Sequence, residues 1–412
     1  METEVVEVEG HIIDSLILAK VLDLILAAGC DYRNLEVDIG RASNDPSRAQ
    51  IEVSAPDEAT LASLLVELQA HGANRLNQVD ARTEPVALEG VLPVGFYSTT
   101  NLPTWVRVGG HWSPVDREEM DCALVVRVGV EGGMPEVSNV PMHRARAGDQ
   151  VVVGTDGVRV KAMERRRQGP HFEFMDSDVS SEKPKSLVVA QVAERLRSVR
   201  AAGGRILVVA GPALIHTGAG PDLAHMARTG WVDVLFAGNG FAAHDMESNV
   251  LGTSLGVPVG GGSPGEGGRA NHLRVINEVR RHGSIAAAVE AGYLRGGVMH
   301  DCVRNGVPFV LGGSVRDDGP LPDVHADVMG AADAMRAELA GVEAALILAS
   351  TLHAIATGNL LSSRVETFCV DINQAVVTKL ADRGSHQALG IVTDVGLFVK
   401  ELAEALCGRL AQ

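Results

Sequence analysis

Positive charge is in short supply in this chain of 412 residues. The sequence holds 36 lysine and arginine residues against 52 aspartate and glutamate residues, which gives a formal net charge of −16 at pH 7. A surface with that balance repels the phosphates of nucleic acids and of anionic membranes. No basic run interleaved with aromatic residues interrupts the acidic background. We therefore expect neither a nucleic acid nor a membrane as a partner.

Several other signals are missing. No apolar run reaches the roughly 18 residues of a membrane span. The opening stretch METEVVEVEG is acidic and lacks the apolar core of a signal peptide. No histidine set has metal-ligand spacing, and the P-loop and G-x-S-x-G motifs are absent. The cysteines form no C-x-x-C pair, which argues against a disulfide framework or a zinc site; they are Cys30, Cys122, Cys302, Cys369 and Cys407. We expect a cytoplasmic protein with reduced cysteines and no metal.

The length and the apolar content of the chain are sufficient for more than one folded domain. Its 412 residues, of which 46% are hydrophobic, suit two or three domains. Residues 1–88 alternate in the order βαββαβ, with strands expected at 4–8, 34–39, 49–54 and 77–82 and helices at 14–28 and 57–71. This order predicts a ferredoxin-like α+β domain, a common frame for small-molecule sensing or oligomerisation.

The remaining chain changes character twice. Residues 89–185 are rich in glycine, proline and short β-type runs such as CALVVRVGV, which predicts a small β domain. Residues 186–412 alternate helical segments with the apolar runs RILVVAG, VDVLFAG, VPFVLGG, EAALILAS, VETFCVD and ALGIVTD. Near-continuous apolar strands between helices are typical of a parallel sheet covered on both faces. The expected class is therefore α/β, with a C-terminal doubly wound, Rossmann-like domain.

Polar residues crowd the ends of these strands. In open α/β sheets ligands bind beyond the carboxyl ends of the strands, and turn chemistry alone requires fewer amide and titratable groups than stand there. We therefore favour one large binding cleft over scattered solvated loops. The residues concerned are Asn239, His244, Asp245, Arg316, Asp317, Asp318, His353, Asp371 and Asp394.

The stretch from Leu346 to Asn373, LILASTLHAIATGNLLSSRVETFCVDIN, has the spacing of a dinucleotide-binding unit. Ser350 and Asp371 are 371 − 350 = 21 residues apart, close to the roughly 20 residues that separate a pyrophosphate turn from the ribose-binding acid. The turn itself lacks the usual glycines. The alternative is an ordinary βα turn followed by an aspartate that caps a helix.

Four further features are ambiguous. Residues 260–265 match G-x-G-x-x-G but follow no convincing strand and contain a proline, so we expect a flexible loop. Residues 218–221, GAGP, are equally compatible with a phosphate-facing helix start and a plain turn. Cys302 is more typical of a core residue than of a nucleophile. Lys183 could face the cleft or solvate a linker, and the linker is slightly favoured.

Several longer blocks resemble a known family. They include GFYSTTNLPTWVRVGG, GPALIHTGAG, AGNGFAAHDMESNVLGTSLG, VPFVLGGSVRDDGPLPDV and VDINQAVVTKLADRG. The chain resembles, from about Val5 to Leu406, the family related to lysine-oxoglutarate reductase and saccharopine dehydrogenase. That family includes the archaeal-type ornithine cyclodeaminases and the C-terminal part of cyanobacterial bifunctional arginine dihydrolases. The arginine-hydrolysing domain of the bifunctional members is absent here, so arginine is not an expected substrate.

The resemblance implies a bound NAD and the conversion of L-ornithine to L-proline and ammonia by transient hydride transfer. It also leads us to expect a homo-oligomer. By resemblance and position, the residues assigned to NAD are Asn239, Gly240, Asp317, Thr351, Leu352, His353, Asp371, Asp394 and Val395. Asp371 would bind a ribose diol, which disfavours the 2′-phosphate of NADP. Residue type and expected cleft position suggest Lys183, Asp245 and Asp318 for acid-base work, and Asn101 and Arg107 for the substrate carboxylate.

Two departures from the family pattern bear on the substrate. Phe241 stands where the pattern G-N-A-L-A has a leucine, and His300-Asp301 replaces a tyrosine-glutamate pair. Both changes are expected to reshape the substrate pocket. Two other functions stay open: a net NAD-dependent amino-acid dehydrogenase, and a sensor without catalysis. Strand-end carboxylates beyond the NAD set favour chemistry over sensing.

Overall fold

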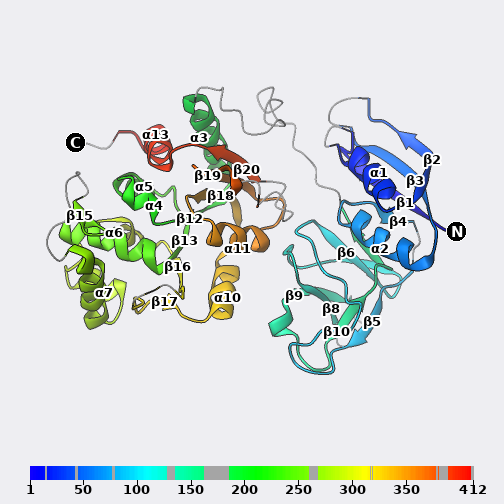
Figure 1. The fold of residues 1–412 in the computed structure, drawn as a ribbon, viewed down its shortest axis with the longest axis horizontal. Helices are drawn as coiled ribbons and strands as arrows, with labels where there is room; N and C mark the ends of the chain where they lie inside the picture. The colour runs from blue at the N-terminus through cyan, green and yellow to red at the C-terminus, as the bar shows by residue number, and fades with distance from the viewer. Residues whose placement is uncertain are drawn as a thin grey trace. The chain divides into compact units, whose positions relative to one another are not determined.

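The structure, a computed structural model, describes residues 1–13, 16–41, 45–76, 79–127, 135–161, 185–258, 268–315, 317, 319–376, 379 and 388–409 (Figure 1). The chain forms two compact units. Unit 1 comprises Met1–Asp176 and Asn359–Ser363, and unit 2 comprises Ser177–Gly358 and Arg364–Gln412. Each unit is described by itself. The division into three domains at residues 88 and 185 stays a prediction, which limited proteolysis can test.

Unit 1 begins with a four-stranded antiparallel sheet and two helices. The elements are β1 (Glu2–Gly10), α1 (Ile17–Ala27), β2 (Asp31–Asp38), β3 (Ser47–Ala55), α2 (Glu58–Gln69) and β4 (Asn74–Arg75). The sheet order β2-β3-β1-β4 is the ferredoxin-like order that the sequence predicts. Alternate residues of β3, including Ile51 and Val53, are buried, since one face of the sheet packs on the core and the other meets solvent.

The last strand of this sheet differs from its prediction. The sequence places it at residues 77–82, whereas Asn74 and Arg75 pair with β1 and Arg82 already belongs to a different sheet. Gly72, at φ +83°, closes the turn after α2 so tightly that the chain reaches β1 earlier. The Asn74 side chain then hydrogen-bonds both backbone groups of Val160, in the neighbouring β region, each at 2.7 Å. This tertiary contact helps to determine where β4 lies. It joins residues that are far apart in the sequence, so no local pattern predicts it.

The rest of unit 1 is the small β region that the sequence predicts. Its strands are β5 (Arg82–Pro85), β6 (Thr104–Val108), β7 (His111–Pro114), β8 (Ala123–Arg127), β9 (Glu136–Val140), β10 (Gln150–Val153) and β11 (Val158–Val160). They form two sheets, β5-β10-β8-β9 and β11-β6-β7. The segment Asn359–Ser363 joins this region: the Met120 amide donates to the Asn359 carbonyl at 3.0 Å, and the Ser363 amide donates to the Asn101 carbonyl at 2.9 Å.

Unit 2 is built on a seven-stranded parallel sheet. All six runs predicted as strands form it, together with a two-residue strand that was not predicted. The strands are β12 (Arg205–Ala210), β13 (Val234–Gly238), β16 (Phe309–Gly312), β17 (Val324–His325), β18 (Val342–Leu348), β19 (Glu366–Asp371) and β20 (Ala388–Val392). Their order is β17-β16-β13-β12-β18-β19-β20. The chain builds outward from β12 in one direction and then returns to its other side with β18, so the strand order reverses between β12 and β18.

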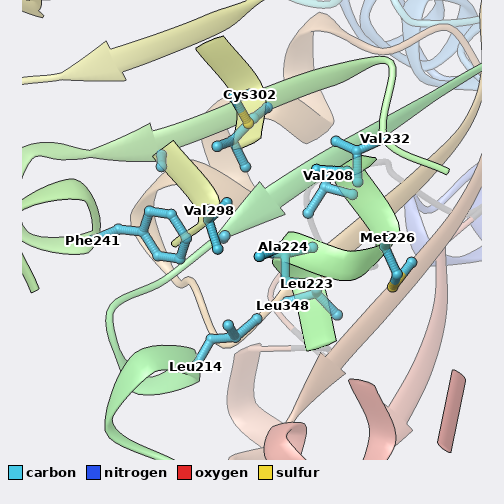
Figure 2. Close-up of a cluster of buried hydrophobic side chains, with 14 of the residues drawn as sticks. Val208, Leu214, Leu223, Ala224, Met226, Val232, Phe241, Val298, Cys302 and Leu348 are labelled. Atoms are coloured by element: carbon cyan, nitrogen blue, oxygen red, sulfur yellow. The ribbon is translucent and has the colours of Figure 1, made fainter. Parts of the chain in front are cut away.

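Helices surround this sheet (Figure 1). They are α3 (Lys185–Ala201), α4 (Ala213–His216), α5 (Gly220–Arg228), α6 (Asn239–Leu251), α7 (Asn271–His282), α8 (Ile285–Glu290), α9 (Val298–Asn305), α10 (Val328–Glu338), α11 (Leu352–Leu360) and α13 (Val395–Cys407). A short hairpin of β14 (Thr253–Ser254) and β15 (Val257–Pro258) follows α6. Figure 2 shows part of the core, where Val208 of β12, Leu223 of α5 and Cys302 of α9 are all fully buried. None of the described helices is long and apolar enough to cross a membrane.

Candidate functional site

The residues predicted for NAD all lie at the carboxyl edge of the unit 2 sheet. Asn239 and Gly240 begin α6 directly after β13, and Asp317 lies in the loop after β16. Thr351, Leu352 and His353 stand between β18 and the first turn of α11. Asp371 is the last residue of β19, and Asp394 and Val395 begin α13 after β20. Because parallel strands end at the same edge, five loops that are distant in sequence meet along one side of the sheet.

The switch point between β12 and β18 requires a glycine. The Gly211 amide donates to the Leu348 carbonyl at 2.9 Å, and a Cβ built on Gly211 would lie 1.7 Å from the carbonyl oxygen of Ala349. Ala349 itself has φ +47°, a left-handed conformation that costs a residue with a side chain about 1 kcal/mol or more. This turn leads directly into α11, so the first turn of that helix lies at the carboxyl edge of the sheet, where the amides of a helix start suit an anion.

His353 lies across the ends of two other strands. A Cβ on Gly238 would approach its Cε1 to 2.9 Å, and a Cβ on Gly312 would approach its Nε2 to 3.1 Å. Glycine at both strand ends therefore makes room for the ring. Burial lowers the pKa of His353, against the opposing effect of the Asp317 carboxylate. The imidazole is consequently neutral at neutral pH, and it can donate or accept a hydrogen bond there.

The aspartates of this edge also make local bonds. Asp371 is 9% exposed, and its Oδ1 accepts the Asn373 amide at 2.8 Å, while among the described residues its Oδ2 accepts no hydrogen bond. Asp394 caps α13 by accepting the Leu397 amide at 2.8 Å. Asp317 accepts the Ser314 amide at 2.8 Å. These bonds fix the side chains, and Asp371 keeps one oxygen for a ligand.

The structure does not bring Asp245 to this edge. Asp245 is fully buried, and its carboxylate accepts the amides of Val298 at 3.0 Å and Met299 at 2.9 Å, at the start of α9. Burial raises its pKa to about 6, although the two amide bonds oppose the shift. A carboxylate inside the core that caps a helix does not meet a substrate. We therefore correct the acid-base assignment of Asp245 to a structural one.

The other residues predicted for catalysis and substrate binding lie elsewhere. Lys183 and Asp318 fall outside the described residues. Asn101 and Arg107 belong to unit 1. Asn101 is 4% exposed, and Arg107 forms an ion pair with Asp80 at 2.7 Å. An anchor for a substrate carboxylate at Arg107 would therefore compete with a carboxylate of the protein itself.

Phe241 and the His300-Asp301 pair lie in or beside the core of unit 2, and their expected effect on the substrate pocket stays a prediction. Phe241 is fully buried, and Figure 2 shows its ring within the core beside Val298. Asp301 is 3% exposed and binds the Arg228 guanidinium at 2.5 Å and His300 Nδ1 at 2.8 Å. The phenyl ring fills space between α6 and α9, and the His300-Asp301 pair ties α9 to α5. Cys302 is buried in the same core, as predicted.

Sequence reasoning missed a group of histidines. His244 on α6 lies between His216 on α4 and His272 on α7, with ring centroids 4.9 Å and 5.9 Å away. His244 Nδ1 lies 3.1 Å from the buried carboxylate of Glu247. The i, i+3 spacing of His244 and Glu247 was the one local signal. The described part of the chain holds no group of three or more side chains suited to a metal ion.

Comparisons with known proteins agree with this arrangement. A model of the Rossmann-fold, C-terminal part of ArgZ-like arginine dihydrolases matches residues 190–402, and a model of the preceding region of the same proteins matches residues 103–189. The conserved region of bifunctional LOR/SDH enzymes matches residues 3–102. The ornithine cyclodeaminase of Methanopyrus kandleri is 51% identical over 407 residues, which cover 98% of this chain and 97% of that protein.

Two solved structures are similar over nearly the whole chain. The crystal structure of apo ArgZ, an arginine dihydrolase from the ornithine-ammonia cycle in cyanobacteria, has a TM-score of 0.84 and 39% identity, covering 98% of this chain and 58% of ArgZ. The ternary complex of AgrE with ornithine and NAD+ has a TM-score of 0.53 and 42% identity, covering 98% of this chain and 57% of AgrE.

The doubly wound sheet and the polar row at its switch point define an enzyme of the Rossmann type. More specifically, the chain belongs to the family of ornithine cyclodeaminases related to LOR/SDH and to the C-terminal part of ArgZ. The family predicted from the sequence blocks is thereby confirmed.

Proposed function

We propose that the protein is an NAD-dependent ornithine cyclodeaminase, which converts L-ornithine to L-proline and ammonia. The observation that carries the proposal is the 51% identity to an archaeal ornithine cyclodeaminase over essentially both chains. A relative with 42% identity forms a complex with both ornithine and NAD+. The crevice at the switch point supplies the kind of site that such a cofactor needs.

The residues at the sheet edge fit a dinucleotide. At the end of β19, Asp371 Oδ2 accepts no hydrogen bond from any residue that the structure describes, and it is suited to a ribose diol. A Cβ on Gly240 would meet nothing within 4 Å, so there is open space at the first turn of α6. The start of α11 offers backbone amides for the pyrophosphate. We propose that these groups, with Asn239, Asp317, Thr351, His353, Asp394 and Val395, hold the cofactor.

When bound, NAD supplies a hydride acceptor for the substrate Cα and returns the hydride at the end of the cycle, so that no net oxidation occurs. The protein must therefore hold the cofactor tightly, exclude water and move protons between the two amino groups of the substrate. Lys183 and Asp318 remain proposed for acid-base work, and Asn101 and Arg107 remain proposed ligands of the substrate carboxylate.

One experiment tests the proposal against its two competitors. Purified protein is incubated with L-ornithine and catalytic NAD, and ammonia, proline and NADH are measured together. We expect equal amounts of ammonia and proline, no accumulation of NADH, and proline that keeps deuterium at Cα when Cα-deuterated ornithine is used. Steady NADH with a keto-acid product would establish a net dehydrogenase. NAD binding without turnover of diamino acids would establish a sensor.

We further propose a cytoplasmic homo-oligomer. None of the five cysteines forms a disulfide bond, which fits a reducing compartment. Strand β2 is an edge strand on which Leu35 and Val37 are 45% and 42% exposed. If two copies of β2 paired antiparallel about the centre of the strand, Arg33 of each would face Glu36 of the other, a charge-complementary match. Light scattering after size exclusion tests this assembly, and Leu35→Lys should weaken it.

A further inference from the structure

The three-histidine group extends to a fully buried carboxylate, Glu247. Glu247 accepts the Gly256 amide at 2.8 Å, the Leu255 amide at 3.2 Å and the Thr253 hydroxyl at 2.8 Å, and it faces His244 Nδ1 at 3.1 Å. Burial raises the pKa of Glu247, but its hydrogen bonds with His244, the Gly256 amide and Thr253 outweigh burial and hold the pKa below its usual value. The carboxylate is therefore ionised and acts only as an acceptor.

An ionised Glu247 fixes the state of the His244 ring. Because the carboxylate can only accept, His244 Nδ1 carries the proton of that bond, and Nε2 is the ring nitrogen left to exchange a proton. A carboxylate that orients an imidazole in this way is the arrangement found where histidine serves as a general base. The hairpin β14–β15 is held by the other bonds of Glu247 without His244, so the bond to His244 is not needed to fix the loop.

The two flanking imidazoles make the surroundings of His244 polar. His216 Nδ1 lies 2.7 Å from the Ser254 hydroxyl. Partial burial and the neighbouring His244 lower the pKa of His216, although Glu247 opposes the shift. The titratable groups that face His244 are thus Glu247 on its own helix, His216 on α4 and His272 on α7.

The histidine group and the proposed cofactor residues share helix α6, which begins at the carboxyl edge of the sheet. Helix α4 follows β12, and α6 follows β13, so both helices leave the carboxyl edge of the sheet on one side of the switch point. Asn239, which begins α6, and His244 are 244 − 239 = 5 residues apart, or about 7.5 Å along the helix axis at 1.5 Å per residue. An imidazole held by an ionised carboxylate is suited to proton transfer.

We propose that His244 is the proton-transfer residue of the cyclodeaminase, and that Glu247 is the residue that positions it. Nε2 takes a proton from the distal ammonium group of the substrate, so that the free amine can bond to Cα; the oxidation of Cα to the level of an imine is the chemistry that bound NAD would supply. After ring closure the ring nitrogen, which is positively charged once it has bonded to Cα, releases a proton to solvent, and His244 returns its proton to the α-amino nitrogen. The lone pair of the ring nitrogen then forms a double bond to Cα while the bond from Cα to the α-amino nitrogen breaks, with its electron pair going to that nitrogen, and ammonia leaves.

This assignment rests on the proposed function, and the test separates the two. His244→Asn is the informative variant, because the asparagine amide can keep a donor near the position of Nδ1 while the basic nitrogen is lost. We expect kcat with ornithine to fall by about 100-fold or more, within the range attributed to general acid-base catalysis, while the Kd for NAD by calorimetry changes less than twofold. Glu247→Gln should lower kcat by about 10-fold or more and alter the acidic limb of its pH profile.

His282→Gln provides the matched control, since His282 lies 3.9 Å from Glu278 on α7, outside the histidine group. Its kcat should equal that of the wild type. If His244→Asn does not fold, His244→Gly with added imidazole replaces it, and recovery of turnover by imidazole is the expected result. A kcat for His244→Asn within threefold of the wild type, or no effect of imidazole on a folded His244→Gly, overturns the assignment. Wild-type protein that binds NAD but does not convert ornithine overturns the proposed function itself, and the proton-transfer role falls with it.

Discussion

The carbonyl oxygen of Ala349 occupies the space that a side chain on Gly211 would need, only 1.7 Å from the position of a Cβ. Both residues belong to backbone at the switch point, so neither can move without separating β12 from β18. We expect Gly211→Ala to lower the free energy of unfolding by about 2 kcal/mol or more, in the range of overpacked sites, and to weaken NAD binding. Denaturant unfolding and calorimetry measure the two effects. Gly240→Ala, where a Cβ meets nothing within 4 Å, should leave stability unchanged or raise it. Equal stability of the two variants would contradict the steric argument.

Asp371 is expected to carry the preference for NAD over NADP. Asp371→Ala removes a charge-assisted hydrogen bond of roughly 1.5 to 3 kcal/mol, so the Kd for NAD should rise by about 10- to 100-fold. Calorimetric titration measures the change. The control is Asp57→Ala, because Asp57 caps α2 in unit 1 through the Thr60 amide, and its loss should cost about 1 kcal/mol of stability without affecting NAD. Unchanged affinity in Asp371→Ala would remove this residue from the site.

Because the pKa of Asp245 is raised, we predict that the wild type loses stability relative to Asp245→Asn as the pH rises. Its folded pKa of about 6 exceeds the ordinary value of 3.8, so the folded state binds the proton more tightly than the unfolded state does. This contribution to stability is present below the unfolded pKa and is lost as the pH rises toward about 6. The difference in unfolding free energy between wild type and Asp245→Asn should therefore shift against the wild type, by up to about 3 kcal/mol, between pH 4 and pH 7. Chemical denaturation at a series of pH values measures it, and a flat difference would show that the shift is absent.

Phe241 is expected to affect stability and not substrate choice. Phe241→Ala should cost about 3 to 5 kcal/mol, as is usual for a phenylalanine removed from a core, and Phe241→Leu less. The KM values for ornithine and lysine should keep the same ratio in Phe241→Leu. Leu397→Ala, at a site that is 44% exposed, is the control for stability. A changed ratio would restore Phe241 to the substrate pocket.

The features that depend on a local sequence pattern could be predicted correctly. Each of the six apolar runs became a strand of one sheet, because a strand buried on both faces must be apolar throughout. The gathering of polar residues at one edge of the sheet was also predictable, because parallel strands all end at the same edge. Strand β17 was not predicted, because two residues are too few to show a periodic pattern.

The errors arise from packing between distant segments. Asp245 lies seven residues beyond the end of β13, within α6, and only the position of α9 shows that its carboxylate is enclosed. The burial of Phe241 likewise depends on how α6 and α9 pack. His216, His244 and His272 come from three helices, so no spacing in the sequence could bring them together. Local patterns predict elements, whereas burial and side-chain clusters depend on how elements pack.

The short segment Asn359–Ser363 limits how this protein can be divided in the laboratory. It belongs to unit 1, yet the chain on both sides of it belongs to unit 2. A fragment that ends at residue 176 would therefore lose the chain partners of the Met120 amide and the Asn101 carbonyl, which water would have to replace. Anyone who wishes to exchange unit 1 between relatives would need to graft two pieces and preserve both junctions of a five-residue insert. Recombination between homologous genes faces the same constraint, because a single crossover near residue 176 would combine the main part of unit 1 from one parent with this segment from the other.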